Sequence, residues 1–504
     1  MTNTILRSTR CRVAATAAAL LLLGGCAPLA RGARPTPARG LAAAVDSIVG
    51  AVPLDRTHWG IAVYDPAADR MVYELNARKH FVPASNTKLV ATTTAMALLG
   101  PDYRYRTELF TLGPGARPGD SRGLLLVARG DPTWSATFQP ANFAVPEALA
   151  DSVRAAGVRR IDGDLVIDAS AFEPMLVNPS WEIGDLVADY GAATGAIAVG
   201  EGTFGLVLLP GLGVGLPAAA RFLGPEPVEP VVTALTTSPS GTRRDFDAER
   251  WAGNDTLYLR GSIPLAAAPD TVNLASANPE TYAARALQSA LEQRGIRVTG
   301  AVRIVHDTLE ARRLRAQPTL GRIASWTSPP IAEIVAAILK PSDNWMAEQV
   351  LKTLGLEKAG RGAWSTGLRV ERRFLIDSVK IDSLAFSLRD GSGLSAQNLL
   401  TPETIVRLLA YGSRAPWGAT YRTALAQPGE RGTLSRRLET LRGRLFAKTG
   451  SIANVNSLSG ILRTDAGHDL VFSIQSNGSG VPSGLIRAAI DRIVLQLARS
   501  GATQ

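Results

Sequence analysis

The segment from about residue 105 to residue 310 constrains the fold of this chain more than any other feature. Its apolar runs are short and are separated by Gly, Pro and Asp, as in residues 123–128 and 163–168. Such punctuation is typical of strands joined by turns. We therefore predict a largely β insertion, with one clear helix at about residues 280–294 that ends at Gly295.

The sequence on both sides of this insertion has a different texture. We predict an antiparallel hairpin formed by residues 60–64 and 71–75, and the periodicity on either side of the insertion favours helices. The predicted helices begin at about Leu41 and at Pro83, the latter running to Leu99, and continue after the insertion at residues 331–340, 345–354 and 362–378. Three strands, at 444–448, 457–462 and 470–475, and a helix at 482–499 complete the chain.

The N-terminus has the pattern of an export signal. Arg7, Arg10 and Arg12 precede an apolar run from residue 13 to 23, and Cys26 follows two glycines. The run is too short for a mature membrane span. We expect residues 1–25 to be a signal peptide of the lipoprotein type, with Cys26 lipidated, while plain cleavage or an uncleaved anchor are the alternatives. Residues 26–40 are expected to be a flexible tether.

Charge and cysteine content exclude several functions. The formal net charge is +10, but the charge is spread along the chain without a basic run interleaved with aromatics, so nucleic-acid binding is not expected. The chain has two cysteines and four scattered histidines, with no spacing suited to metal ligands. We expect neither a metal nor an organic cofactor.

A serine and a lysine at the start of the helix after Pro83 are the first candidates for chemistry. Ser85 and Lys88 are three positions apart, and such positions share a helix face. A lysine amine can remove the proton of a serine hydroxyl and make it a nucleophile. Alone, this motif is equally compatible with a helix-capping serine beside a surface lysine.

Two segments offer a second polar group of the form S-x-N. Ser276-Ala277-Asn278 precedes Pro279 inside the insertion and is interpreted as a turn before a helix. Ser342-Asp343-Asn344 lies in a short break between two predicted helices, where side chains can face a cleft. We therefore select Ser342 and Asn344.

Lys448-Thr449-Gly450 supplies a third motif, at the predicted end of a strand. The chain has only seven lysines, so this tripeptide is rarely expected by chance. A lysine at a strand edge beside a glycine can hold a substrate carboxylate while the backbone passes close to the ligand. The alternative is an exposed lysine with a turn glycine.

The order S-x-x-K, S-D-N, K-T-G is the active-site set of penicillin-binding proteins and serine β-lactamases. The chain resembles the low-molecular-mass class C penicillin-binding proteins, which are D-alanyl-D-alanine carboxypeptidases and endopeptidases of the bacterial envelope. The long separation of Ser85 from Ser342 also resembles this family. Further similar segments are Pro83-Ala84-Ser85-Asn86-Thr87-Lys88, Gly130-Asp131-Pro132-Thr133, Asp390-Gly391-Ser392-Gly393-Leu394-Ser395 and Gly432-Thr433-Leu434.

The resemblance implies an α/β (α+β) fold with an antiparallel sheet flanked by helices, interrupted by a β-rich insertion of two nested domains. The implied catalytic domain covers residues 41–105 and 320–504. Insertion domain II covers 106–190 and 270–319, and nested domain III covers 191–269. The implied setting is the periplasm or cell envelope, with peptidoglycan stem peptides and β-lactam antibiotics as ligands.

The resemblance also implies a role for each site residue. Ser85 attacks the carbonyl between two D-alanines with Lys88 as base, and Ser342 relays a proton to the leaving amine. Asn344 binds the substrate amide. Lys448 with Thr449 engages the terminal carboxylate, and Gly450 belongs to the same substrate-binding strand. Backbone N–H groups of Ser85 and Ser451 form the oxyanion hole.

Two other functions stay open from the sequence. One is a serine β-lactamase or esterase on the same machinery, distinguished by rapid loss of a penicilloyl adduct. The other is a catalytically silent envelope-binding protein, distinguished by failure of the folded protein to react with a penicillin.

Overall fold

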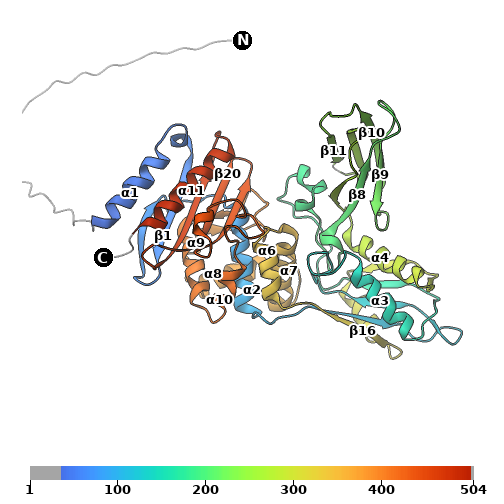
Figure 1. Cartoon of the computed structure of the whole chain (residues 1–504). Coiled ribbons are helices and arrows are strands. Elements are labelled where there is room, and N and C mark those ends of the chain that lie inside the picture. Colours follow the sequence, from blue (N-terminus) through green and yellow to red (C-terminus); the bar gives the residue numbers. More distant parts are fainter. Residues whose placement is uncertain (1–35, 252, 501–504) are drawn as a thin grey trace, which may run out of the picture.

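The computed structural model describes residues 36–251 and 253–500, which form two lobes and a projecting part built of two small sheets (Figure 1). The expected signal peptide, Cys26 and most of the expected tether lie outside these residues. Residues 36–40, also assigned to the tether, instead begin helix α1 (Thr36–Val49). Pro37 lies in the first turn of α1, where a missing N–H breaks no helical hydrogen bond.

One lobe is built on a five-stranded sheet in the order β19-β20-β21-β1-β2. All neighbouring strands are antiparallel. The two N-terminal strands, β1 and β2, form the predicted hairpin. β1 also pairs with the C-terminal strand β21, so the sheet joins the two ends of the chain. The strands are β1 (His58–Asp65), β2 (Arg70–Leu75), β19 (Leu445–Ile452), β20 (Val455–Arg463) and β21 (Asp469–Asn477).

Helices cover both faces of this sheet, and two separate apolar cores result. On one face α1 packs beside α11 (Ser483–Arg499), with Leu41, Ile490 and Phe472 in the core between helices and sheet. The other face is covered by α2 (Lys88–Leu98), α6 (Ile331–Leu339), α7 (Asn344–Ala359), α8 (Trp364–Asp377), α9 (Pro402–Arg414) and α10 (Gly418–Ala424). The expected fold class, an antiparallel sheet flanked by helices, is confirmed.

The other lobe consists of the insertion. Its five-stranded sheet has the order β15-β7-β5-β3-β16, and a small sheet has the order β14-β6-β4. Helices α3 (Ala144–Ala155), α4 (Pro279–Gln293) and α5 (Thr308–Arg315) accompany them. The strands are β3 (Arg106–Thr111), β4 (Asp120–Ser121), β5 (Leu124–Val127), β6 (Arg160–Ile161), β7 (Leu165–Asp168), β14 (Arg297–Val298), β15 (Val302–Val305) and β16 (Gly321–Thr327).

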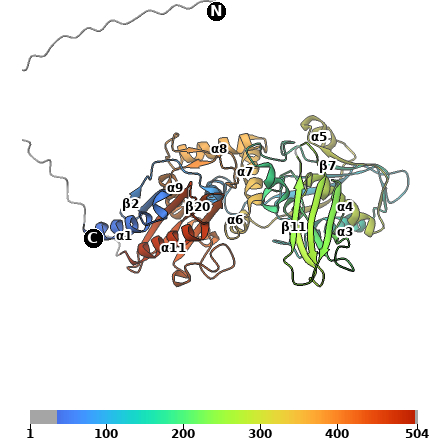
Figure 2. The same cartoon turned by 90° about the horizontal axis from the view of Figure 1, so that it is seen from above.

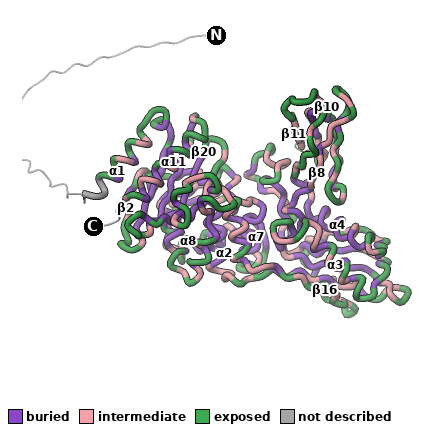
Figure 3. The backbone as a smooth tube through the Cα atoms, viewed as in Figure 1, coloured by how far each residue is buried: buried purple, intermediate pink, exposed green. Residues whose placement is uncertain are grey.

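Two three-stranded sheets project from this lobe, in the orders β13-β8-β9 and β10-β12-β11 (Figures 1 and 2). Figure 3 shows buried backbone running through the bases of these sheets, while much of their outer end is exposed. The strands are β8 (Thr203–Leu209), β9 (Ala219–Leu223), β10 (Val231–Ser238), β11 (Asp245–Arg250), β12 (Leu257–Pro264) and β13 (Asp270–Ala275).

The insertion differs from the sequence expectation in three respects. It contains α3 and α5 besides the predicted helix α4. Strand β16, expected in the catalytic domain, pairs with β3 in the sheet of the insertion. Strand β13, expected in domain II, pairs with β8 in the projecting part. We therefore propose that the catalytic domain resumes after Thr327 and that the nested domain extends to Ala275.

The helix pair α6–α7 lies between the two lobes in both views (Figures 1 and 2). Helix α7 packs against α2 and also contacts the insertion through the turn Gly200–Gly202. The junction of the two lobes is therefore formed by α6, which ends at Leu339, and α7, which begins at Asn344, with Ser342 and Asp343 in the break between them.

Candidate active site

Ser85 and Lys88 lie where a 3-10 turn passes into a helix. The turn is Ala84–Thr87, and Lys88 is the first residue of α2. Lys88 is fully buried, whereas Ser85 is partly exposed. The Lys88 Nζ atom donates to Ser85 Oγ at 2.9 Å, so the predicted pair is in contact.

The second motif forms the break between α6 and α7. Ser342 has a φ of +76°, a left-handed conformation that few residues other than glycine adopt and that is often found at functional sites. The carboxylate of Asp343 caps α7 by accepting from Met346 N at 2.7 Å. Asn344, the first residue of α7, is thereby directed at Lys88, and its Oδ1 accepts from Lys88 Nζ at 2.6 Å.

The third motif lies inside a strand and not at its end. β19 continues through Gly450 to Ile452, with Gly450 opposite Ser457 of β20. The predicted strand end is therefore wrong: a tripeptide that resembles a turn is here part of an extended ladder. Lys448 is fully buried, and its Nζ donates to Ser342 Oγ at 2.7 Å and to the carbonyl of Thr449 at 2.8 Å.

Gly450 brings β19 against the turn that carries the serine. A Cβ atom on Gly450 would lie 2.8 Å from the carbonyl oxygen of Pro83 and 3.1 Å from the backbone N of Ser85. The strand backbone can approach this closely only without a side chain. Ser457 fixes the contact from the next strand, because its Oγ donates to the Pro83 carbonyl at 2.8 Å. Ser451, which follows Gly450, is exposed.

Burial shifts the pKa values of the two lysines in the site. It lowers the pKa of Lys88 to about 8, an effect that the carboxyl groups of Asp343, Asp390 and Glu348 oppose. Burial also lowers the pKa of Lys448 well below its ordinary value, and the charge of Lys88 acts in the same direction. Desolvation is the principal cause of the lowered pKa of Lys88.

Two contacts of the site come from residues that the sequence did not suggest. Lys88 Nζ also donates to the carbonyl of Ser392 at 2.7 Å, and Asn344 Nδ2 donates to the carbonyl of Tyr190 at 2.8 Å. Both acceptors are backbone atoms, so side-chain type gave no signal for them. In the sequence, the segment 390–395 stands out only by its similarity to the family.

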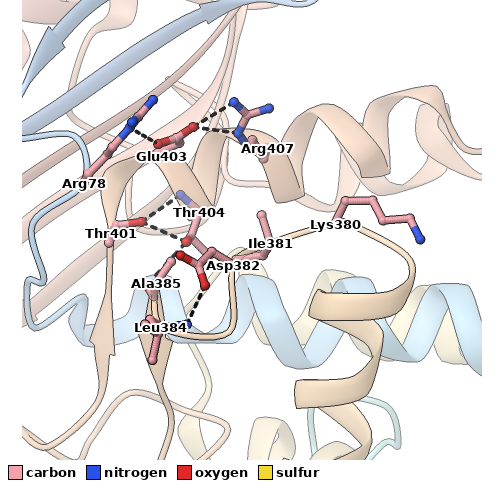
Figure 4. A pocket seen from close by; sticks show the side chains of 10 residues that line it. All are labelled: Arg78, Lys380, Ile381, Asp382, Leu384, Ala385, Thr401, Glu403, Thr404 and Arg407. Atoms are coloured by element: carbon pink, nitrogen blue, oxygen red, sulfur yellow. Dashed lines mark hydrogen bonds and ion pairs between the residues drawn. The ribbon is translucent and has the colours of Figure 1, made fainter.

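Of two cavities in the described part of the chain, one is lined by motif residues and the other is not. A cleft of about 1080 Å³ is lined by Ser342, Asp343, Asn344 and Tyr190, and its far wall comes from the insertion, including Glu201. A second cavity, of about 610 Å³, lies at the start of α9 and contains none of the motif residues (Figure 4). There Arg78 and Arg407 both point at Glu403 and form ion pairs with it.

These contacts define a class of protein. The site combines three features: a serine hydroxyl in contact with a buried lysine of lowered pKa, a second serine hydrogen-bonded to a second lysine, and a strand that passes the nucleophile. Together they suit acyl transfer through a serine ester. The geometry is that of a penicillin-binding-protein or β-lactamase-like serine enzyme.

Comparison with known proteins identifies the family within that class. The model of the D-Ala-D-Ala carboxypeptidase 3 (S13) family matches residues 41–498, and the chain belongs to this family. A D-alanyl-D-alanine carboxypeptidase of Actinomadura sp. (strain R39) is 32% identical over 95% of this chain and 88% of its own length. The chain is accordingly a serine-type D-Ala-D-Ala carboxypeptidase that acts on peptidoglycan.

More distant relatives share the same fold. The carboxypeptidase DacB of Haemophilus influenzae is 24% identical over 81% of this chain and 83% of its own length. The crystal structure of penicillin binding protein 4 from the same organism superposes with a TM-score of 0.77, at 21% identity, and covers 90% of this chain and 99% of that chain.

Proposed function

We propose that Ser85 is the nucleophile and Lys88 the general base of this carboxypeptidase. The observation that carries the assignment is the 2.9 Å contact between the buried Lys88 amine and Ser85 Oγ. Neutral Lys88 takes the hydroxyl proton as Oγ bonds to the carbonyl carbon of the penultimate D-alanine. The bond to the terminal D-alanine nitrogen then breaks, and water later hydrolyses the ester.

The second serine and lysine complete the proton path. Ser342 Oγ accepts from Lys448 and lies on the cleft, so it can pass a proton to the leaving amine. The Asn344 side chain, beside Lys88, is the proposed partner of the substrate amide. Backbone N–H groups of Ser85 and Ser451 are the proposed oxyanion donors.

Substrate binding itself activates the base. Lys448, Thr449 and Gly450 form the proposed wall for the terminal carboxylate. A carboxylate near Lys448 favours its protonated form, and the new positive charge beside Lys88 favours the neutral amine there. The enzyme thus gains its base when a substrate with a free C-terminus is in place.

We also propose ligands, further substrates and a location for this enzyme. A relative of this fold was crystallised in complex with a β-lactam, and its structure superposes with a TM-score of 0.72. We propose that β-lactams acylate Ser85, that cross-links between stem peptides are further substrates, and that Cys26 carries a lipid anchor in the envelope.

No helix among residues 36–251 and 253–500 has the length and apolarity needed to cross a bilayer.

The test is Ser85→Ala. The variant should retain the fold, release no D-alanine from a D-Ala-D-Ala peptide and form no covalent adduct with a fluorescent penicillin. Ser451→Ala serves as a control, because its proposed contribution is a backbone N–H. An adduct on the Ser85→Ala protein would disprove the assignment, and an adduct lasting milliseconds on the native enzyme would indicate a β-lactamase.

A further inference from the structure

The Lys88 amine is held by a loop that belongs to none of the three motifs. Its third acceptor, besides Ser85 and Asn344, is the backbone carbonyl of Ser392. Because this acceptor is a backbone atom, the position of the lysine depends on whatever fixes the loop of residues 390–395.

Glu348 fixes the near side of this loop. Its carboxylate is fully buried and accepts from Ser392 N at 2.7 Å and from Gly391 N at 3.0 Å. The indole N–H of Trp364 donates to the same carboxylate at 2.7 Å. Burial and the neighbouring Asp390 raise the pKa of Glu348 to about 7, while the three donors favour its ionised form. A buried group with three donors aimed at it has a single well-defined geometry.

Asp390 fixes the far side. It is also fully buried, and its carboxylate accepts from Gly393 N at 2.8 Å and from Ser395 N at 2.7 Å. Gly393 has a φ of +82°, and a Cβ there would lie within 1.9 Å of the carbonyl oxygen of Ala84. The loop is therefore pressed against the turn that carries Ser85.

Helix α7 joins this arrangement to the second motif. Glu348 follows Asn344 by four residues, so both side chains lie on one face of α7. Asn344 contacts Lys88 directly, and Glu348 reaches it through the Ser392 carbonyl. One rigid helix thus sets two of the three acceptors of the lysine.

We propose that Glu348 is a positioning residue for acylation: its buried carboxylate fixes the Ser392 carbonyl and so holds the Lys88 amine against Ser85. Glu348 touches neither the substrate nor Ser85, and the inference rests on the roles proposed above for Ser85 and Lys88. The remaining charged or titratable groups around Glu348 and Lys88 are Asp343, Asp390, Glu371, Lys352 and Lys448.

Glu348→Gln tests the proposal, with Glu357→Gln as the matched control at the exposed end of the same helix. The glutamine keeps the size of the side chain, but its –NH₂ group is a donor and cannot accept hydrogen bonds from the loop N–H groups. Acylation by a fluorescent penicillin should slow about ten- to a hundredfold, since small displacements of a catalytic group have effects of that size. The thermal midpoint should fall, because a buried N–H donor loses its acceptor. In the folded protein the fraction of molecules that react and KM should change little.

The pH profile separates positioning from a general loss of structure. The carboxylate of Glu348 favours the ammonium form of Lys88, so its removal should move the rise of the acylation rate to lower pH. Glu348→Asp keeps the charge and withdraws the carboxylate, and should slow acylation without moving the profile; this variant decides the matter if Glu348→Gln does not fold.

A folded Glu348→Gln enzyme with the native rate and profile would overturn the proposal. So would a reduced reactive fraction in which each molecule reacts at the native rate. If the native enzyme itself formed no adduct at Ser85, the assignment of the nucleophile would fail, and the role of Glu348 that rests on it would fail too; a native adduct with unchanged Glu348→Gln kinetics would overturn the role of Glu348 alone.

Discussion

Replacing Gly450 by alanine should slow acylation of Ser85 about a hundredfold while the fold persists. The new Cβ would lie 2.2 Å from Ser457 Oγ and 2.8 Å from the Pro83 carbonyl oxygen. Ordinary contact begins near 3.4 Å, so β19 and the serine turn must separate by about 0.6 Å. Displacements approaching 1 Å in an active site cost about 10²-fold in rate, equivalent to about 2.7 kcal/mol of activation free energy.

The assay is the second-order rate of acylation by a fluorescent penicillin, measured together with kcat/KM on a D-Ala-D-Ala peptide. Overpacking at one site typically destabilises by about 1–3 kcal/mol, which thermal unfolding can measure separately. Gly484→Ala is the control, because a Cβ on Gly484 meets nothing within 4 Å and the residue lies in α11. That substitution should leave the rate unchanged.

A second variant tests the cause of the effect. Ser457→Ala in the Gly450→Ala background removes the side-chain clash but leaves the clash with the Pro83 carbonyl. It also removes the hydrogen bond from Ser457 to Pro83, so it should not restore the rate. A folded Gly450→Ala enzyme that acylates at the native rate would refute the reasoning.

Two further predictions concern proton transfer. Ser342→Ala should lower kcat for a D-Ala-D-Ala peptide by about 10²–10⁴-fold. An ester substrate should be affected much less, because an alkoxide leaving group needs protonation less than an amine does. Equal losses on both substrates would argue against a proton relay. Because the pKa of Lys88 is about 8 and the neutral amine is the base, kcat/KM should rise with pH through about 8. The kcat profile, which reports the bound state, should rise at lower pH because substrate-bound Lys448 becomes charged; coincident profiles would contradict that coupling.

The sequence predicted the reactive groups well because each motif is short and chemically distinctive. The five predicted residues come from segments up to 363 residues apart. They form two hydrogen-bonded groups, Ser85–Lys88–Asn344 and Ser342–Lys448, which the short segment from Ser342 to Asn344 connects. The helices and strands around them also appeared close to their predicted positions, because their hydrophobic periodicity is strong.

The supporting groups could not be predicted in the same way. Glu348 lies inside a helix, and its partners are backbone N–H groups 43 and 44 residues away, which no local pattern reveals. Thr449 and Gly450 resemble a turn in sequence, whereas pairing with β20 keeps them extended. Helix α3 was missed in a stretch dominated by strand and turn patterns, where Pro146 occupies its first turn.

The joining of N-terminal and C-terminal strands in the catalytic sheet has a consequence for how the polypeptide acquires its activity. The turn with Ser85 lies against Gly450 of β19 and Ser457 of β20, so it gains its supporting wall only when residues beyond 445 have been synthesised. The Ser457 to Pro83 bond alone spans 374 residues. Closing so long a loop is slow, and the insertion, whose contacts are nearer in sequence, can fold first. Premature termination between the end of β16 at Thr327 and the start of β19 at Leu445 should therefore yield a chain in which the insertion is formed and the enzyme is not.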